Sequence, residues 1–356
     1  MMRPYSKRYL VVCTLRIGDV LLTTPVIHAI RLADPTAQID VMVLRGIEGT
    51  LEGNPDINRV IAIPHRAGFF VRLKEILGLW RRYDVALSTV SSDRARWYCF
   101  IAGKMSAGLY NTHTAWLSVR LLDKRVLFDD IHTHTVSMGL QVLDLLGIPK
   151  FYHVIPPAAG GSFPAELSKG PYAVLHPFPK FSYKMWSQEH WIALIDELAR
   201  QGIRSVLTGG PAPEEMKYVE QIAKNSGATN LCGALSLAKT ADLISRAILF
   251  VGPDTGVTHI AAAVGTPTIA LFGPSNPVKW GPWPSSYARD ESPWHMKGSQ
   301  QVGNVSLIQG EGDCVPCRGE GCEKNRTSYS KCLDELTVRR VMVEIDRIKA
   351  GQSDEI

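Results

Sequence analysis

Short apolar runs alternate with segments of helical periodicity along both halves of the chain. Such alternation is typical of βαβ units, in which strands form a parallel sheet covered by helices. In the first half the pattern predicts strands at residues 9–15, 39–44, 59–63 and 84–88, with helices at 19–33 and 136–146.

The second half repeats the pattern after residues 156–170, a segment rich in Pro, Gly, Ala and Ser that is typical of a linker. Residues 275–334 are rich in Trp, Pro and Cys and are expected to be irregular, and a final amphipathic helix is predicted at about 335–349. We therefore expect an α/β protein with two doubly wound domains. The strands of the second half are expected at 172–177, 205–210, 248–253 and 268–274.

The composition is that of an ordinary globular protein. With 45% hydrophobic residues and a net charge of only +5, the chain is not intrinsically disordered. A length of 356 residues favours two domains. No apolar run approaches the ~20 residues that a membrane-spanning helix needs. Arg16 and Asp19 interrupt the apolar N-terminal stretch, so we interpret it as part of the fold rather than as a signal peptide, and we expect a cytoplasmic protein.

The positive charge is concentrated in the first half. Residues 1–150 contain 19 Lys and Arg against 13 Asp and Glu, whereas the remaining residues are nearly balanced. This asymmetry has two readings: an ordinary basic surface, or a site for an anionic partner such as a phosphorylated substrate or an acidic membrane. Nucleic acid is not expected, because the basic residues are dispersed and no recognition motif accompanies them.

The segment 251–274, VGPDTGVTHIAAAVGTPTIALFGP, holds the strongest candidate site. A buried strand ends at Pro253, and a helix is expected to begin around Asp254, Thr255, Gly256 and Val257, with His259 on the same helical face as Thr255. Free N–H groups at a helix start bind anions, and the end of a parallel strand is where nucleotides bind. Separately, Asp254 could be a helix cap and His259 a core histidine; together the residues favour a diphosphate site.

Two further segments follow predicted strands. Lys184 lies beside Trp186 in the loop after 172–177, where a lysine suits the phosphate charge of a leaving group, although a lone lysine is usually a surface residue. Glu214 and Glu215 follow the strand at 205–210, where a carboxylate accepts ribose hydroxyl hydrogen bonds. An acidic first helical turn explains the glutamates equally well.

Asp19 follows the first predicted strand in the turn LRIGDV. The turn has one glycine and is not a GxGxxG element. Asp19 is either the N-cap of a helix or a general base that the N–H groups of the helix start keep ionised.

Seven cysteines are present. Cys13, Cys99 and Cys232 lie in apolar segments and are expected to be core residues. Cys314, Cys317, Cys322 and Cys332 have the spacing C-x2-C-x4-C-x9-C, which in a cytosolic protein favours a metal over disulfides. These four thiols are candidates for a structural zinc site, the alternative being free thiols.

Three elements resemble the ADP-heptose:lipopolysaccharide heptosyltransferases of glycosyltransferase family nine: RIGDVLLTTPV at 16–26, KMW at 184–186, and DTGVTHIAAAVGTPTIALFGPS at 254–275. The resemblance extends over nearly the whole chain. The tail cysteines are similar to those of the branch that adds later inner-core heptoses. The resemblance implies the GT-B fold, two Rossmann-like domains facing a central cleft.

The resemblance also implies an activity: inverting, metal-independent transfer of a heptosyl group from ADP-heptose to the inner core of lipopolysaccharide. It assigns the base to Asp19, diphosphate binding to Lys184, and phosphate and sugar binding to Asp254, Thr255, Gly256, Val257 and His259. The ribose carboxylate is Glu214 or Glu215. The acceptor would be an anionic lipopolysaccharide core at the membrane surface, so peripheral attachment to the inner face of the cytoplasmic membrane is part of this expectation. One departure is the loop before Lys184, where Phe178, Pro179 and Phe181 replace hydroxyl residues that contact phosphate in some relatives.

On this basis we assign residues 1–155 to an acceptor-binding domain, 156–170 to a linker, 171–334 to a donor-binding domain with a cysteine-rich tail, and 335–356 to a C-terminal helix packing back toward the first domain. Two alternatives remain open. One is a GT-B transferase or epimerase that uses another nucleotide sugar. The other is a non-catalytic nucleotide-sugar-binding module, against which Asp19 argues because a binder needs no base.

Overall fold

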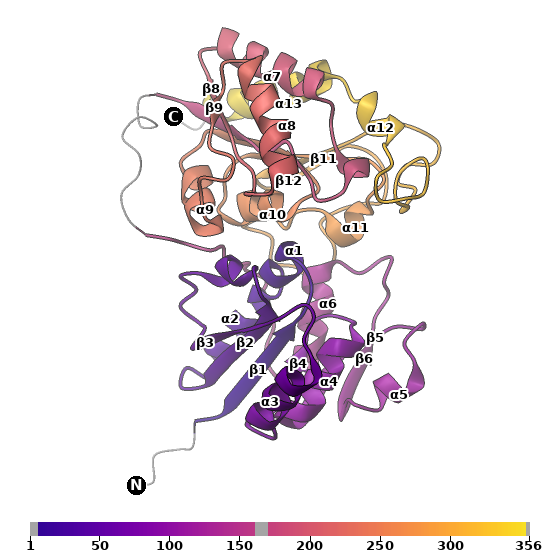
Figure 1. Ribbon diagram of the computed structural model, residues 1–356. Helices are drawn as coiled ribbons and strands as arrows, with labels where there is room; N and C mark the ends of the chain where they lie inside the picture. Colours follow the sequence, from indigo (N-terminus) through magenta and orange to yellow (C-terminus); the bar gives the residue numbers. More distant parts are fainter. Residues whose placement is uncertain (1–5, 161–169, 354–356) are drawn as a thin grey trace. The chain divides into compact units, whose positions relative to one another are not determined.

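The computed structural model describes residues 6–160 and 170–353, which form two compact units. The first unit contains the chain up to Pro157 and a short return segment, Ala288–Ser292; the second contains the rest. Most of the expected linker, residues 161–169, lies outside the described residues. Each unit is an α/β sandwich with a parallel sheet at its centre (Figure 1).

The sheet of the first unit has the strand order β3-β2-β1-β4-β5-β6, and all its strands are parallel. Strand β1 is central and almost wholly buried, because helices cover both faces of the sheet and both sets of side chains must be apolar. The order reverses between β1 and β4, which is the point where open α/β sheets bind ligands. The strands are β1 Arg8–Cys13, β2 Gln38–Leu44, β3 Arg59–Ile63, β4 Tyr83–Ser88, β5 Gly103–Tyr110 and β6 Lys124–Leu127.

The apolar runs predicted the first four strands, but β5 and β6 were not predicted. Strand β5 contains small and polar residues instead of an apolar run. At its first residue, Gly103, a Cβ would come within 2.9 Å of the Ala86 side chain on β4. The expected single helix at 19–33 is wrong. It is two helices, α1 and α2, and Pro25 at the start of α2 has no N–H for a continuous helix. The helices are α1 Ile17–Leu21, α2 Thr24–Ala33, η1 Glu48–Leu51, α3 Phe69–Leu79, α4 Asp93–Ala102, α5 Trp116–Val119 and α6 Thr135–Asp144.

The sheet of the second unit has the order β12-β13-β11-β10-β7-β8-β9, and only β12 is antiparallel to its neighbour. The order reverses between β7 and β10, so the loops after these two strands meet at the ligand-binding edge of the sheet. The strands are β7 Tyr172–Leu175, β8 Arg204–Leu207, β9 Thr229–Asn230, β10 Leu249–Pro253, β11 Thr268–Phe272, β12 Gln300–Val302 and β13 Val305–Gln309.

The expectation that residues 275–334 are irregular is only partly right. The hairpin β12–β13 lies within them and adds to the sheet, with β13 fully buried beside β11. The helices of this unit are η2 Ser182–Lys184, α7 Gln188–Arg200, α8 Pro213–Lys224, α9 Leu237–Ser245, α10 Gly256–Ala263, α11 Pro277–Trp280, α12 Lys331–Asp334 and α13 Val338–Ser353.

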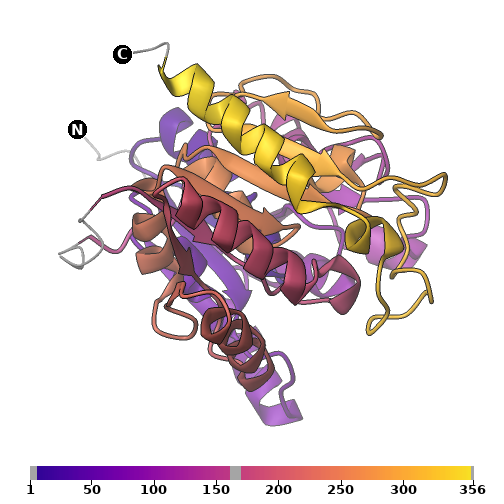
Figure 2. The same ribbon diagram turned by 90° about the horizontal axis from the view of Figure 1, so that it is seen from above.

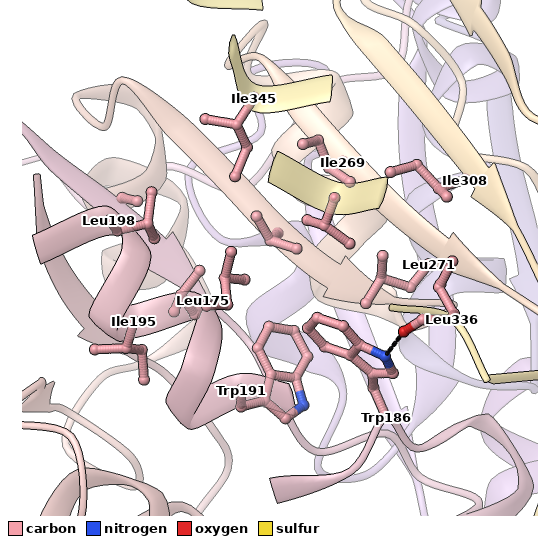
Figure 3. Close-up of a cluster of buried hydrophobic side chains, with 14 of the residues drawn as sticks. Leu175, Trp186, Trp191, Ile195, Leu198, Ile269, Leu271, Ile308, Leu336 and Ile345 are labelled. Carbon is pink, nitrogen blue, oxygen red and sulfur yellow. Dashed lines mark hydrogen bonds between the residues drawn. The ribbon is translucent and has the colours of Figure 1, made fainter. Parts of the chain in front are cut away.

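Helix α13 packs beside α7 in the second unit (Figures 1 and 2). Its residues Val341 and Ile345 are buried in the same core cluster as Trp191 of α7 and Leu336, just before the helix (Figure 3). The apolar face of this helix is therefore used within the second unit, and the expectation that the helix also packs back toward the first domain stays a prediction. No helix in the described part of the chain is long and apolar enough to cross a membrane.

Candidate active site

Lys184 and Asp254 meet at the switch point of the second sheet. Lys184 is carried by the loop after β7 and Asp254 directly follows β10, which is the neighbour of β7. Lys184 Nζ donates a 2.5 Å hydrogen bond to Asp254 Oδ2, and only 18% of the lysine side chain and 8% of the aspartate side chain are exposed. The structure thus joins two candidates that are 70 residues apart in the sequence.

The charge on Asp254 is stabilised by its surroundings. Burial by itself would raise the pKa of this carboxyl, but the Lys184 ammonium and a hydrogen bond from Ser275 hold the pKa below its usual value. Ser275 follows β11, the next strand of the sheet, and was not among the candidates. Its position after a strand was the signal that could have found it. The carboxylate is therefore ionised at neutral pH and can accept hydrogen bonds.

Helix α10 begins directly after this ion pair. Thr255 is its N-cap, in an extended conformation, and its Oγ1 accepts a hydrogen bond from the N–H of Thr258. Asp254 therefore is not the helix cap, and that alternative is wrong. Gly256 and Val257 are the first helical residues, so their N–H groups lie where helices leave them without an intrahelical acceptor. The Val257 side chain packs in the core, which leaves its backbone N–H as the group available to a ligand.

His259 is buried on α10, near both members of the ion pair. Burial lowers its pKa to about 4, so the imidazole is neutral at physiological pH. Its Nδ1 makes no hydrogen bond with any residue that the structure describes. A buried polar atom without a partner is costly, and a substrate hydroxyl would satisfy it.

Aromatic rings hold the loop that carries Lys184. Phe181 and Tyr183 stack with a 5.4 Å centroid separation, and Lys184 Nζ lies 6.0 Å from the centroid of each ring. Trp186 is fully buried and its Nε1–H donates a 2.7 Å hydrogen bond to the carbonyl oxygen of Leu336 (Figure 3). The tryptophan next to the lysine is therefore an anchor, which fixes the loop on the core. Phe178, near the start of the loop that follows β7, packs edge-on against Tyr218.

The two glutamates after β8 occupy different environments. Glu215 turns back toward the end of the strand, where its Oε1 accepts a 2.6 Å hydrogen bond from the N–H of Gly210. Burial raises the pKa of this carboxyl. Glu214 is exposed on the first turn of α8. Only Glu215 is held at the strand end, where a ribose carboxylate is expected.

Asp19 lies at the switch point of the first sheet, in α1 directly after β1. Its side chain is buried, and Oδ2 accepts a 3.2 Å hydrogen bond from the N–H of Arg16. Asp19 thus lies at a helix start, and its ionisation by the N–H groups there stays a prediction. The capping interaction and the role of a general base are both compatible with this geometry.

The four tail cysteines belong to one neighbourhood. Cys332 is buried and the other three are exposed. Burial raises the pKa of Cys332 to about 11, and the nearby Cys322, Cys317 and Cys314 add to this effect. Among the described residues, no three His, Cys, Asp or Glu side chains lie close enough together to hold a metal. The zinc site stays a prediction.

The two doubly wound units, each with polar residues at its switch point, define the fold class, which is the GT-B fold of the solved heptosyltransferase structures. Residues 72–297 match the model of glycosyltransferase family 9 (heptosyltransferase), and the chain belongs to this family. The resemblance drawn from the sequence motifs is confirmed, and transfer is supported over an epimerase or a binding module.

Individual relatives agree with the family. The chain is 32% identical over 288 residues to lipopolysaccharide heptosyltransferase 3 of Escherichia coli strain K12, covering 75% of this chain and 82% of the relative. The solved structure of E. coli ADP-heptose lps heptosyltransferase II has a TM-score of 0.73 at 20% identity, with 98% and 99% of the two chains covered. E. coli heptosyltransferase WaaC, solved with ADP, has a TM-score of 0.72 at 23% identity, with 96% and 99% covered.

Proposed function

We propose that this glycosyltransferase moves a heptosyl group from ADP-heptose to the inner core of lipopolysaccharide, with inversion at the anomeric carbon. The observation that carries the proposal is the cluster of Lys184, Asp254 and His259 at the start of α10. The names of the relatives support it, since one is a lipopolysaccharide heptosyltransferase and another was solved with ADP. No metal is assigned a part in the reaction.

Different groups of this site would bind different parts of the donor, according to their charge. The N–H groups of Gly256 and Val257 and the Lys184 ammonium attract the diphosphate, whose negative charge grows as ADP leaves. An ionised Asp254 repels phosphate but accepts hydrogen bonds from sugar hydroxyls, and His259 Nδ1 offers a further acceptor or donor. Glu215 is the better candidate for the ribose, because it is held at the strand end.

Asp19 is proposed as the general base. The acceptor hydroxyl loses its proton to the Asp19 carboxylate as its oxygen attacks the anomeric carbon from the face opposite the diphosphate. The new carbon–oxygen bond forms while the bond to the phosphate oxygen breaks, and ADP leaves with the electron pair. Positioning two substrates for this attack supplies part of the barrier reduction, roughly 7–11 kcal/mol at most.

The acceptor is proposed to be anionic and bound by the first unit. The excess of 19 basic over 13 acidic side chains in residues 1–150 supports this assignment. A lipopolysaccharide acceptor would place the protein at the inner face of the cytoplasmic membrane as a peripheral protein. The similarity to heptosyltransferase 3 supports a later heptose addition rather than the first.

The test is product formation with purified protein and a panel of donors. We expect transfer from ADP-heptose and none from UDP- or GDP-linked sugars, with a core that already carries heptose as the better acceptor. Transfer from a UDP- or GDP-sugar, with ADP-heptose inert, would contradict the donor assignment. A preference for a heptose-free core would contradict a later heptose addition.

A further inference from the structure

Helix α3 exposes large apolar side chains and turns a charged pair inward. A helix on a globular protein normally turns apolar residues inward and charged residues outward. In α3 the side chains of Phe69, Phe70 and Leu77 are 74%, 83% and 70% exposed. Helical spacing puts these residues and Leu73 on one stripe, which Trp80 extends at the end of the helix. We call this set of five residues the aromatic face of α3.

The inward face of α3 explains why the helix keeps this orientation. Arg72 donates a hydrogen bond to the hydroxyl of Tyr98 on α4, and that hydroxyl donates a 2.8 Å hydrogen bond to Glu75 Oε2. Ile76 and Leu79 complete the inner side. The charged pair is therefore used inside the unit, and turning the helix over would break this chain of hydrogen bonds. The exposure of the aromatic face is fixed by the packing of α3 on α4 (Figure 1).

The exposed charged side chains of the segment 64–82, which contains this face, have one sign. Between residues 64 and 82 the only acidic residue is Glu75, which faces inward. The exposed cations are Arg66, Lys74, Arg81 and Arg82. Aromatic and aliphatic side chains flanked by lysine and arginine are the composition of helices that lie in a bilayer interface and bind anionic lipids. A docking site for a basic or neutral protein would lack this complementarity.

The two neighbouring helices also expose aromatic side chains. Helix α4 contacts both α3 and α5. On α4, Trp97 and Phe100 are exposed and form an edge-to-face pair with centroids 6.2 Å apart, and α5 exposes Trp116 and Leu117. Tryptophan is enriched at membrane interfaces, since its ring is apolar and its N–H stays hydrated.

We propose that the aromatic face of α3 inserts into the interfacial layer of an anionic phospholipid bilayer, with the flanking cations on the lipid headgroups. The inference rests on the proposed function in one respect only: attachment to the membrane would bring the enzyme to a lipid-borne acceptor. The attachment itself requires neither donor nor acceptor. Failure of the proposed donor or acceptor chemistry would therefore leave the lipid-binding result unaffected.

The experiment is co-sedimentation of the full chain with vesicles of phosphatidylcholine alone or mixed with phosphatidylglycerol, without substrates. We expect binding to the mixed vesicles only, reduced by high salt, and weaker by about tenfold or more in a Phe70→Ser and Leu77→Ser double variant. The matched control is Val343→Ser, which replaces a 62% exposed valine on α13 and should bind like the unmodified protein. Because the replaced side chains are exposed, the double variant should keep its melting temperature.

A second variant separates charge from insertion. Lys74→Glu with Arg82→Glu should abolish the preference for anionic vesicles while leaving the aromatic face intact. Equal binding of the unmodified protein to both kinds of vesicle, or unchanged binding by the double serine variant, would overturn the proposal. A concentration-dependent dimer in sedimentation velocity that the serine variant dissolves would also overturn it, since the face would then be a contact between two copies of this chain.

Discussion

Lys184 Nζ lies 2.5 Å from Asp254 Oδ2, across the two loops that leave the neighbouring strands β7 and β10. Since both side chains are largely shielded from water, replacing Lys184 removes the counter-charge of a buried carboxylate. The reading of Lys184 as an ordinary exposed lysine is therefore wrong, and its loss should affect stability as well as catalysis.

The first prediction concerns Lys184→Ala. We expect a loss of roughly 1–3 kcal/mol in the free energy of unfolding, less than the 3–5 kcal/mol of a fully buried pair. Binding of ADP should weaken, and kcat should fall further because negative charge grows on the leaving diphosphate. Denaturant unfolding, calorimetry with ADP and single-turnover rates measure the three quantities. Lys180→Ala, an exposed lysine of the same loop, is the control. If both variants bind ADP equally well, Lys184 has no role in diphosphate binding.

The second prediction concerns Asp19→Asn. The amide oxygen of asparagine can still accept the N–H of Arg16, so the melting temperature should change little. Loss of the base should lower kcat by ~10² to 10⁴. ADP affinity should be unchanged, because the donor candidates all belong to the second unit. Near-normal turnover of this variant would show that Asp19 is a helix-capping residue alone.

The third prediction compares two buried tryptophans (Figure 3). Trp186→Phe removes the donor to the Leu336 carbonyl and leaves that oxygen buried without a partner. Trp191 Nε1 has no hydrogen-bond partner among the described residues, so Trp191→Phe loses only volume. Both tryptophans are fully buried. Denaturant unfolding should therefore show Trp186→Phe to be less stable than Trp191→Phe by roughly 1–3 kcal/mol. Equal losses would mean that the hydrogen bond contributes nothing net.

The fourth prediction concerns stability in mild acid. His176 is buried, and burial lowers its pKa from 6.5 to about 4. Between pH 6.5 and pH 4 this histidine is therefore protonated in the unfolded chain but neutral in the folded protein. Its contribution to the free energy of unfolding is fully present above pH 6.5 and is lost as the pH falls toward 4. The contribution is roughly 3 kcal/mol at most. His176→Gln should flatten the dependence of the melting temperature on pH over this range. An unchanged slope in the variant would rule out His176 as a source of the acid sensitivity.

The fifth prediction concerns the tail cysteines. If they hold a structural zinc, protein purified under reducing conditions should contain close to one zinc per chain, since four thiolates can bind zinc tetrahedrally. Cys317→Ser should lose the metal, whereas Cys232→Ser, outside the cluster, should retain it. Elemental analysis decides between the two readings. Absence of metal would assign these residues to free thiols.

The sequence by itself determined the class of fold and the main site motif. Apolar runs of strand length separated by helical periodicity specify parallel strands, and eight of the described strands coincide with a predicted run. The start of α10 was also predictable, because a strand end, a hydroxyl cap and a glycine are local signals. The same dependence on local signals explains which strands were missed. The residues of β5 do not form a distinct apolar run, and the hairpin β12–β13 lies in a segment whose composition resembles a loop.

Only the tertiary structure decided which distant residues meet. The order of strands in the sheet brings Lys184 to Asp254 and adds Ser275, and hydrophobic periodicity carries no information about that order. Packing likewise made Trp186 an anchor for Leu336, separated Glu215 from Glu214, and turned the polar side of α3 inward onto Tyr98. Periodicity predicts that a helix has two faces, but the groups available on its neighbours decide which face is buried.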